Sequence, residues 1–337
     1  MFQIMPDRRL TAAELTQFGV RLEDEGPHGF HPGVEWWNES WFWDWFDADG
    51  ERAGHCRIGV HPNQGRAWLW LFVHQDGEWV ALEEPRLPLA DWNVARLAYD
   101  RWGLSCSWEV RAPLEGGRLR VQGFGRVVSG RRTGQVAPVG VDLDIQALGP
   151  PHSHGRANAP GHSAGDAYPA SRFEQPIRAL GELRVGSDAR PFSGRGERDH
   201  SWGPRHWNLE WTFLVLNGES LRLQCAEARI PNVGSFVAGY FQDGPMVTVK
   251  EAVFEFEYPP DDVLHPVSGR FSIATETGER FAARIDALTG AEIDLTHTFV
   301  PPRRSLYRRA LVRATPEGGG APLLGWVEFN RFVPPAA

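Results

Sequence analysis

Short segments of alternating apolar and polar residues, separated at regular intervals by turn residues, dominate this sequence. Segments at this spacing are typical of antiparallel strands that close into a sandwich or barrel, and Asn217-Gly218 between two of them is a hairpin-turn signal. Helix signals are scarce, and the clearest is a capping-box-like start at residues 11–15. The sequence therefore predicts an all-β fold preceded by a short helix. The expected strands cover residues 41–46, 53–60, 67–74, 79–82, 104–111, 119–128, 139–147, 173–185, 209–216, 220–227, 234–242, 247–258, 267–275, 280–287, 305–315 and 323–332.

The length of 337 residues favours two domains over a single core. Each half of the chain is a run of hairpins without intervening helices, so each half is expected to form its own antiparallel barrel or sandwich. We place the first domain at residues 1–190 and the second at 191–337, joined near residues 186–197. Residues 150–169 interrupt the strand pattern with prolines, histidines and small residues, and they predict a long loop.

Charge and hydropathy exclude several classes of partner. The formal net charge of -8 argues against nucleic acid, which requires a basic surface. No apolar run has the length of a signal peptide or a membrane span, so we expect neither export nor an integral membrane segment. The three cysteines are widely spaced among apolar neighbours, as buried thiols are in a reducing compartment. These observations predict a cytoplasmic protein, and no pattern specifies its oligomeric state.

Tryptophan is abundant, with 15 residues against five tyrosines. An indole packs a large rigid area and leaves one N–H group to satisfy, so an excess builds either sheet cores or aromatic walls around a ligand. Trp37, Trp41, Trp43 and Trp45 fall on one face of an expected strand, and Glu35 and Glu39 share that face. A carboxylate at the start of such an aromatic strand, here Glu35, is a candidate acid of raised pKa. The alternative is a strand end whose indoles simply fill a barrel.

The densest group of reactive side chains is Arg198-Asp199-His200-Ser201-Trp202-Gly203. If this segment is extended, His200 and Trp202 share one face while Asp199 points the other way. An imidazole beside an indole suits proton transfer on an apolar substrate, because histidine titrates near neutral pH and an aromatic face stabilises a developing cation. The alternative is structural: Asp199 forms a buried ion pair with Arg198 or Arg205 that fastens the two halves together.

Other chemistries have weaker support. His55, His61 and His74 lack the close spacing of metal ligands, and His152, His154 and His162 suggest at most adventitious metal binding, so no metal site is expected. No glycine-rich phosphate loop between a strand and a helix is present. The Gly-x-Ser-x-Gly pattern of serine hydrolases occurs at residues 161–165, but it falls in the expected loop rather than between a strand and a helix, and no helix signal follows Ser201 either, so a serine hydrolase is not expected.

Glu35-Trp36-Trp37 ahead of the first strands, together with Asp199-His200-Ser201-Trp202-Gly203, resembles the hydroxyneurosporene synthase/carotenoid hydratase-like superfamily. The resemblance implies two consecutive lipocalin-like β-barrel domains. It also implies acid-initiated chemistry on lipophilic alkenes, namely water addition, cyclisation or rearrangement, without a metal or organic cofactor. His200 and Trp202 fall where members of the superfamily carry functional His and Trp residues.

We therefore expect a cofactor-independent acid/base lyase or isomerase that acts on a terpenoid, steroid-like or polyketide-like small molecule. The candidate catalytic residues are His200, Asp199 and Glu35. The candidate substrate-binding residues are Trp36, Trp37, Trp202, Arg205, Trp207 and Tyr240. The alternative function is a lipocalin-like carrier that binds a lipophilic ligand without changing it.

Overall fold

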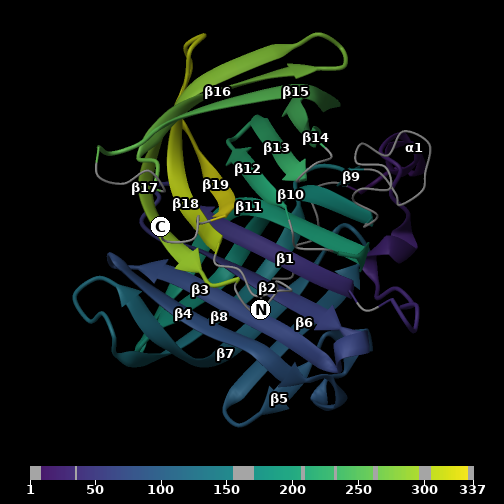
Figure 1. The fold of residues 1–337 in the computed structure, drawn as a ribbon, viewed down its shortest axis with the longest axis vertical. Coiled ribbons are helices and arrows are strands. Elements are labelled where there is room, and N and C mark those ends of the chain that lie inside the picture. Colours follow the sequence, from purple (N-terminus) through teal and green to yellow (C-terminus); the bar gives the residue numbers. More distant parts are fainter. Residues whose placement is uncertain are drawn as a thin grey trace. The chain divides into compact units, whose positions relative to one another are not determined.

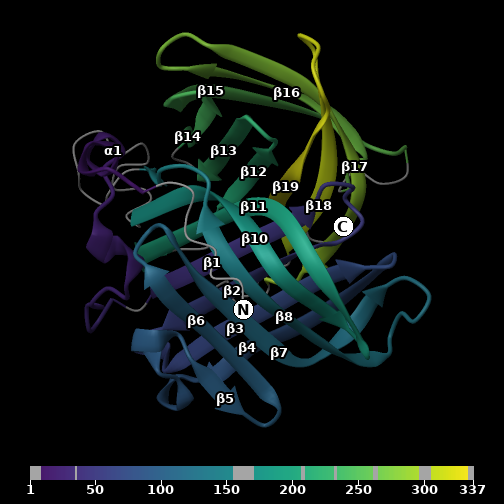
Figure 2. The ribbon, with the colours of Figure 1, turned by 180° about the vertical axis from the view of Figure 1, so that it is seen from behind.

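The computed structural model of the protein describes residues 9–34, 36–154, 171–205, 209–230, 234–260, 265–295 and 305–332. These residues form two compact units, one that ends at Arg205 and one that begins at Leu209. Figures 1 and 2 show the strands of both units from opposite sides.

The first unit is a large antiparallel sheet with short helical segments. The helical segments are α1 (Ala12–Gln17), η1 (Leu22–Glu25), η2 (Pro62–Gln64), η3 (Leu89–Asp91) and η4 (Val94–Arg96), of which the η segments are 3₁₀ helices. The strands are β1 (Trp37–Asp47), β2 (Ala53–His61), β3 (Arg66–Gln75), β4 (Glu78–Pro88), β5 (Tyr99–Arg101), β6 (Leu104–Ala112), β7 (Gly116–Ser129), β8 (Val136–Ala147), β9 (His152–Ser153), β10 (Ser171–Val185) and β11 (Asp188–Pro204).

This sheet closes on itself. Its strand order is β4-β3-β2-β1-β11-β10-β8-β7-β6-β5, and β4 also pairs with β7. The extra pairing joins β4 and β7 into a ring with the strands between them, and β6 and β5 extend the sheet beyond that ring. The sheet is therefore a barrel whose strands β1 and β11 are neighbours.

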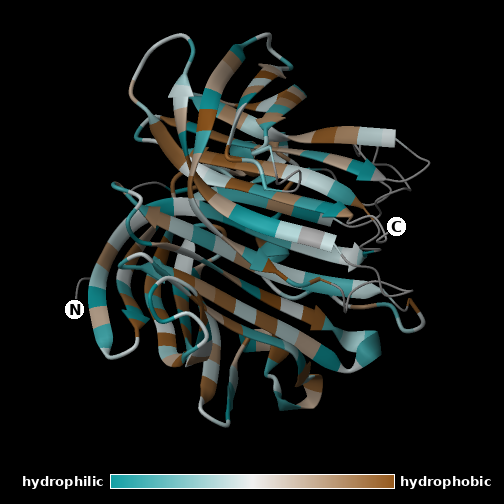
Figure 3. Ribbon diagram, turned by 60° about the vertical axis from the view of Figure 1, so that its left-hand side comes forward, coloured by the Kyte–Doolittle hydropathy of each residue, from teal (hydrophilic) through white to brown (hydrophobic). Residues whose placement is uncertain are grey.

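Alternate residues of the strands fill the interior of the first unit, since successive side chains of a strand point to opposite faces. Figure 3 shows this alternation of hydrophilic and hydrophobic residues along many strands. Trp41, Trp43 and Trp45 of β1 are at most 2% exposed and belong to one apolar cluster with Trp108. Much of the tryptophan excess therefore builds a sheet core, which was one of the two roles expected for it.

The second unit is a closed antiparallel barrel. Its apolar interior includes Leu214, Cys225, Phe271 and Val327. The predicted turn at Asn217-Gly218 joins the first two strands, and the Gly218 N–H donates to the Leu221 carbonyl at 2.8 Å. The strands are β12 (Glu210–Asn217), β13 (Leu221–Ile230), β14 (Gly234–Asp243), β15 (Met246–Glu257), β16 (Ser268–Thr275), β17 (Arg280–Ile293), β18 (Ser305–Pro316) and β19 (Leu323–Phe332).

The predicted all-β class, with two consecutive antiparallel β units after a short helix, is confirmed. The helix α1 begins at a capping box in which the Thr11 side chain accepts from the Glu14 N–H and the Glu14 side chain accepts from the Thr11 N–H. Two residues of the expected long loop, His152 and Ser153, form β9 against β10. Residues 155–170 lie outside the described residues, and they include most of that expected loop.

The division between the units differs from the expected one at residue 190. β11 pairs with β1 on one side and with β10 on the other, so the backbone hydrogen bonds of residues 188–204 are made within the first unit. Gly186, with a φ of 68°, lies in the turn between β10 and β11 rather than in a junction between domains. The division therefore falls after Arg205.

Two expectations from the sequence concern membrane spans and the cysteines. No helix in the described part of the chain is long and apolar enough to cross a membrane. Cys56, Cys106 and Cys225 are free and buried, and burial raises the pKa of each thiol well above its ordinary value. These thiols therefore act as packing groups.

His152 makes the stability of the first unit depend on pH. Its side chain is buried against the ring of Phe18, at 5.4 Å between centroids, and burial lowers the pKa of His152 to about 4. Between about pH 6.5 and pH 4 the unfolded chain binds a proton at this position that the folded chain does not, so stability falls as the pH falls. Chemical denaturation should show His152→Phe gaining on the wild type by up to about 3 kcal/mol over that range. Parallel stability curves for the two proteins would contradict this account.

Candidate functional site

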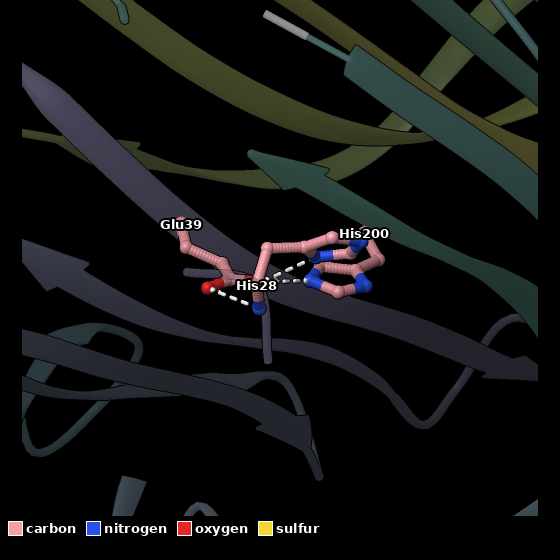
Figure 4. Close-up of side chains that lie close together, drawn as sticks. All are labelled: His28, Glu39 and His200. Carbon is pink, nitrogen blue, oxygen red and sulfur yellow. Dashed lines mark hydrogen bonds and ion pairs between the residues drawn. The ribbon is translucent and has the colours of Figure 1, made fainter. Parts of the chain in front are cut away.

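Glu39 in β1 carries a buried carboxylate on which two histidine side chains converge (Figure 4). His28 Nδ1 lies 2.8 Å and His200 Nε2 lies 2.9 Å from the same oxygen, Glu39 Oε1. The backbone N–H of His28 also donates to the carboxylate, at 2.9 Å from Oε1 and 3.1 Å from Oε2. We call His28, Glu39 and His200 the histidine–glutamate cluster.

The register between β1 and β11 brings two members of this cluster together. Trp41 lies opposite His200, and Glu39 lies opposite Trp202. Residues directly opposite in an antiparallel pair share a face, and so do residues two apart on one strand. The carboxylate, the imidazole and both indoles therefore stand on the same face of the sheet, which is the face of the apolar interior.

One proton is held between His200 and Glu39. His200 Nδ1 lies 2.7 Å from the backbone carbonyl oxygen of Asp24, and this oxygen only accepts, so Nδ1 carries a hydrogen. Nε2 then either donates to an ionised Glu39, which makes the ring an imidazolium, or accepts from a protonated Glu39. Both states place one transferable proton between Nε2 and Oε1.

The surroundings favour the charged forms of two members. Burial opposes ionisation of Glu39, but hydrogen bonds from His200 and His28 outweigh burial and lower the pKa of the carboxyl. Burial likewise opposes a charge on His28, but hydrogen bonds to Asp24 and Glu39 outweigh it and raise the pKa of the imidazole. The side chain of His28 is 17% exposed, against 2% for that of His200, so His28 is the member nearest solvent.

Aromatic rings enclose the cluster. His200 stacks on Trp41 with 4.4 Å between centroids, and His28 stacks on Trp202 with 3.9 Å between centroids. Phe173 of β10 meets His200 edge-on at 5.8 Å. His200 and Trp202 also contact each other at 5.0 Å, on the shared face that the sequence predicted. The ionisable groups therefore lie in a largely apolar setting.

A buried ion pair fixes the segment that carries Asp24. Arg198 of β11 donates to both oxygens of Glu25, at 2.9 and 2.8 Å, and the Leu114 N–H donates to the same carboxylate at 2.7 Å. Burial alone raises the pKa of Glu25, but the charge and hydrogen bonds of Arg198 outweigh it and the pKa is lowered. Because Asp24 is the neighbour of Glu25, this pair holds the carbonyl that binds His200 Nδ1.

Asp199 lies on the opposite side of β11 from His200. Its Oδ2 accepts from Arg172 Nη2 at 2.9 Å, and Arg172 also donates to Glu174. Asp199 therefore forms an ion pair, but the expected partner was wrong: Arg172 of the same unit takes the place of Arg198, which points to the other face and binds Glu25. Asp199 is not a member of the histidine–glutamate cluster.

The other predicted site residues have separate places. Trp37 is buried on the face of Glu39, whereas Trp36 is partly exposed and its carbonyl accepts from the Arg205 N–H at 2.9 Å. Tyr240 is buried in β14 of the second unit. Two candidates lie outside the described residues, Glu35 and Trp207.

Three residues of this site are not among the residues that the sequence predicts. They are Glu39 and His28 of the cluster and Asp24, which contacts both histidines. The sequence puts Glu39 on the face of Trp37 but does not mark it as a site residue, because nothing in one sequence gives the register that sets it beside His200. His28 and Asp24 lie in a turn-rich segment without periodicity. Their positions depend on the Glu25–Arg198 pair, which joins residues 173 positions apart. No local pattern could have found them.

Fold and site together define an all-β protein of two compact units, the first of which carries a buried histidine–glutamate cluster. Residues 21–333 match the family model described as domain of unknown function DUF7064, and the chain belongs to that family. None of the curated proteins matches the sequence.

Solved structures with similar folds share little sequence identity with this chain. A Nitrosomonas europaea protein provisionally assigned as AttH is 14% identical with a TM-score of 0.64, over 99% of this chain and 100% of its own. CghA in complex with Sch210972 is 11% identical with a TM-score of 0.54, over 90% and 93%. Kievitone hydratase from Nectria haematococca is 10% identical with a TM-score of 0.55, over 89% and 92%. At these identities the similarity is one of fold, and it agrees with the all-β architecture of two consecutive units that the sequence resemblance implied.

The Glu25–Arg198 pair gives a stability prediction. Arg198→Met leaves the Glu25 carboxylate buried without its partner, which should destabilise the first unit by about 3–5 kcal/mol. The double variant Glu25→Leu/Arg198→Met should recover most of that loss, because no unpaired charge remains. Tryptophan fluorescence during chemical denaturation reports this unit, since 12 of the 15 tryptophans precede residue 205.

Arg190→Met is the matched control for that cycle. Arg190 pairs with Asp188 and Asp76 at the surface, so its loss should cost about 1 kcal/mol or less. If Arg198→Met cost no more than this control, the proposed anchoring of η1 would be wrong.

Proposed function

We propose that this protein is an acid/base lyase or isomerase that acts on a lipophilic small molecule at the histidine–glutamate cluster. One observation carries the proposal: His28 Nδ1 and His200 Nε2 converge on a single buried oxygen of Glu39. A transferable proton in an apolar setting is what acid-initiated chemistry on an alkene requires.

Hydration would proceed in two proton-balanced steps. The proton between His200 and Glu39 moves to one carbon of a double bond, and the other carbon becomes cationic. Water then forms a bond to that carbon and returns one proton to the His200–Glu39 pair, so that the site ends as it began. Dehydration is the reverse of these steps, and isomerisation returns a proton from a neighbouring carbon instead of from water.

The aromatic surroundings suit the cationic intermediate of such a reaction. Trp41 and Trp202 present indole faces beside the two histidines, and an indole face attracts a cation at short range. Within the described residues, the buried indole N–H groups of Trp37 and Trp41 have no hydrogen-bond partner. Trp43 and Trp45 in the apolar core share this feature, so the indole N–H groups do not select a substrate, and the terpenoid, steroid-like or polyketide-like class rests on the sequence resemblance.

The similar structures support the same class of function. Kievitone hydratase is by name a hydratase, and CghA was solved with the small molecule Sch210972 bound. Two proteins with this fold therefore act on or bind small organic molecules. The proposal transfers only that class to this chain, since sequence identities of 10% and 11% carry no detail of substrate.

We assign His200 and Glu39 the proton transfer, His28 proton exchange with solvent, and Trp202 and Trp37 contact with the ligand. Asp199, paired with Arg172, is assigned to holding β10 against β11. Five candidate residues keep their roles as predictions only: Glu35, Trp36, Arg205, Trp207 and Tyr240. A cytoplasmic location is likewise still a prediction.

The first experiment is native mass spectrometry of the protein purified from its own host, followed by identification of the co-purified lipophile. With that molecule or its precursor as substrate, His200→Gln and Glu39→Gln should each lower kcat by about 10²–10⁴-fold. His265→Gln is the control, because His265 bonds Glu292 at 2.6 Å in an exposed pair of the second unit and should retain full turnover.

The outcome also separates an enzyme from a carrier. A carrier would return its ligand unchanged after prolonged incubation, and the two cluster variants would alter affinity only. Conversion of the ligand at equal rates by the wild type and His200→Gln would place the chemistry elsewhere in the molecule.

A further inference from the structure

We propose that the histidine–glutamate cluster is a binding site for one divalent transition-metal ion of the Zn²⁺ type, with His28 Nδ1, His200 Nε2 and Glu39 Oε1 as ligands. The sequence predicts no metal site, because the histidines considered for one lack the close spacing of metal ligands. The three cluster residues are 11 and 161 positions apart, so their sequence spacing does not point to a site either. The inference concerns binding alone and does not depend on the proposed reaction.

The donor set is the first reason. Two imidazole nitrogens and one carboxylate oxygen are the protein ligands of many zinc sites that keep a position open for water or substrate. The three atoms lie within 4.8 Å of one another. Tetrahedral coordination at about 2.0–2.1 Å requires ligand atoms about 3.3 Å apart. The nitrogens lie 2.8 and 2.9 Å from Glu39 Oε1, so small side-chain movements would admit the ion.

The second reason is that both histidines already have the outer partners typical of metal ligands. A ligating imidazole usually donates its other N–H to a carbonyl or a carboxylate, which fixes the tautomer and the ring orientation. His200 Nδ1 is 2.7 Å from the Asp24 carbonyl oxygen, which leaves Nε2 facing the cluster. His28 Nε2 is 3.5 Å from Asp24 Oδ1, which leaves Nδ1 facing it. Asp24 thus orients both rings from outside the ligand set.

Charge and access also fit a divalent cation. The carboxylate of Glu39 and that of Asp24 lie on opposite sides of His28, and each is at most 5% exposed. The backbone N–H of His28 donates to Glu39 Oε2 at 3.1 Å, so this second oxygen has a partner of its own besides Oε1. His28 is partly exposed, so a water molecule can reach the fourth position from its side.

The ion and the shared protons exclude each other. Coordination at His28 Nδ1 and His200 Nε2 requires that neither nitrogen carries a hydrogen, so the protons that the two nitrogens share with Glu39 in the metal-free site must leave. The cluster can therefore hold either the shared protons or a metal ion, but not both at once. Excess Zn²⁺ should suppress any reaction that uses the protons, and a chelator should restore it.

Chelator-treated full-length protein is the material for the test, with Zn²⁺ and Co²⁺ as probes. We expect one equivalent of either ion by equilibrium dialysis. We also expect the strong visible absorption of four- or five-coordinate Co²⁺, which the hydrated ion lacks. His28→Gln, the least buried ligand change, should lower Zn²⁺ affinity by more than about 100-fold. Asp24→Asn, which changes an outer partner, should lower it by about 10–100-fold.

Two control variants identify binding elsewhere. His265→Gln removes an exposed histidine–carboxylate pair, and His154→Ala/His162→Ala removes two histidines of the segment that the sequence marked for adventitious binding. Both should bind like the wild type, and circular dichroism should show that every variant is folded. Absence of a bound equivalent in the wild type overturns the proposal, and so does loss of the Co²⁺ spectrum in a control instead of in His28→Gln.

These readouts need no substrate, so the two proposals can fail separately. Metal binding with no turnover of any co-purified lipophile would end the proposed function alone. Turnover that depends on His200, without stoichiometric metal binding, would end the metal proposal alone.

Discussion

The register between β1 and β11 is the constraint on which the rest of the site depends. It sets Glu39 opposite Trp202, Trp41 opposite His200 and Trp43 opposite Arg198. Because the side-chain period of a strand is two residues, a slip of one position would turn all of these side chains to the other face. The indoles of β1 resist such a slip, since three of them are sealed in the apolar core. Core packing and site geometry are therefore fixed by the same strand pair.

The segment before β1, which includes η1 and His28, supplies the remaining groups of the site. Arg198 lies on the face that carries His200, and its guanidinium forms a buried, bidentate ion pair with the carboxylate of Glu25. A buried pair of this kind adds little net stability over apolar packing, but breaking it is costly, so it specifies where η1 docks. The docked segment then supplies the Asp24 carbonyl that sets the tautomer of His200 and the backbone N–H of His28 that binds Glu39. The ion pair therefore contributes by fixing the position of η1 and not by adding net stability.

The same geometry connects the proposed reaction with the proposed metal site. A carboxylate that receives two imidazole N–H groups can share a proton with them, and the same three atoms can surround an ion once those protons leave. Which occupant is present depends on the competition between proton and metal at two nitrogens. The aromatic surroundings of Trp41, Trp202 and Phe173 strengthen both interactions, because they keep bulk water away from the charges.

The sequence by itself determined most of the strands, the hairpin turn at Asn217-Gly218, the all-β class, the capped helix at Thr11 and the face shared by His200 and Trp202, but not the strand β11. These features follow from local rules of periodicity, turn chemistry and capping, which act over a few residues. Only the tertiary structure decided that residues 188–204 join the first sheet, that Arg172 takes Asp199, and that His28 and His200 meet on Glu39. Those outcomes depend on strand order and register and on a buried ion pair between residues 173 positions apart, and one sequence does not encode such pairings in any local pattern.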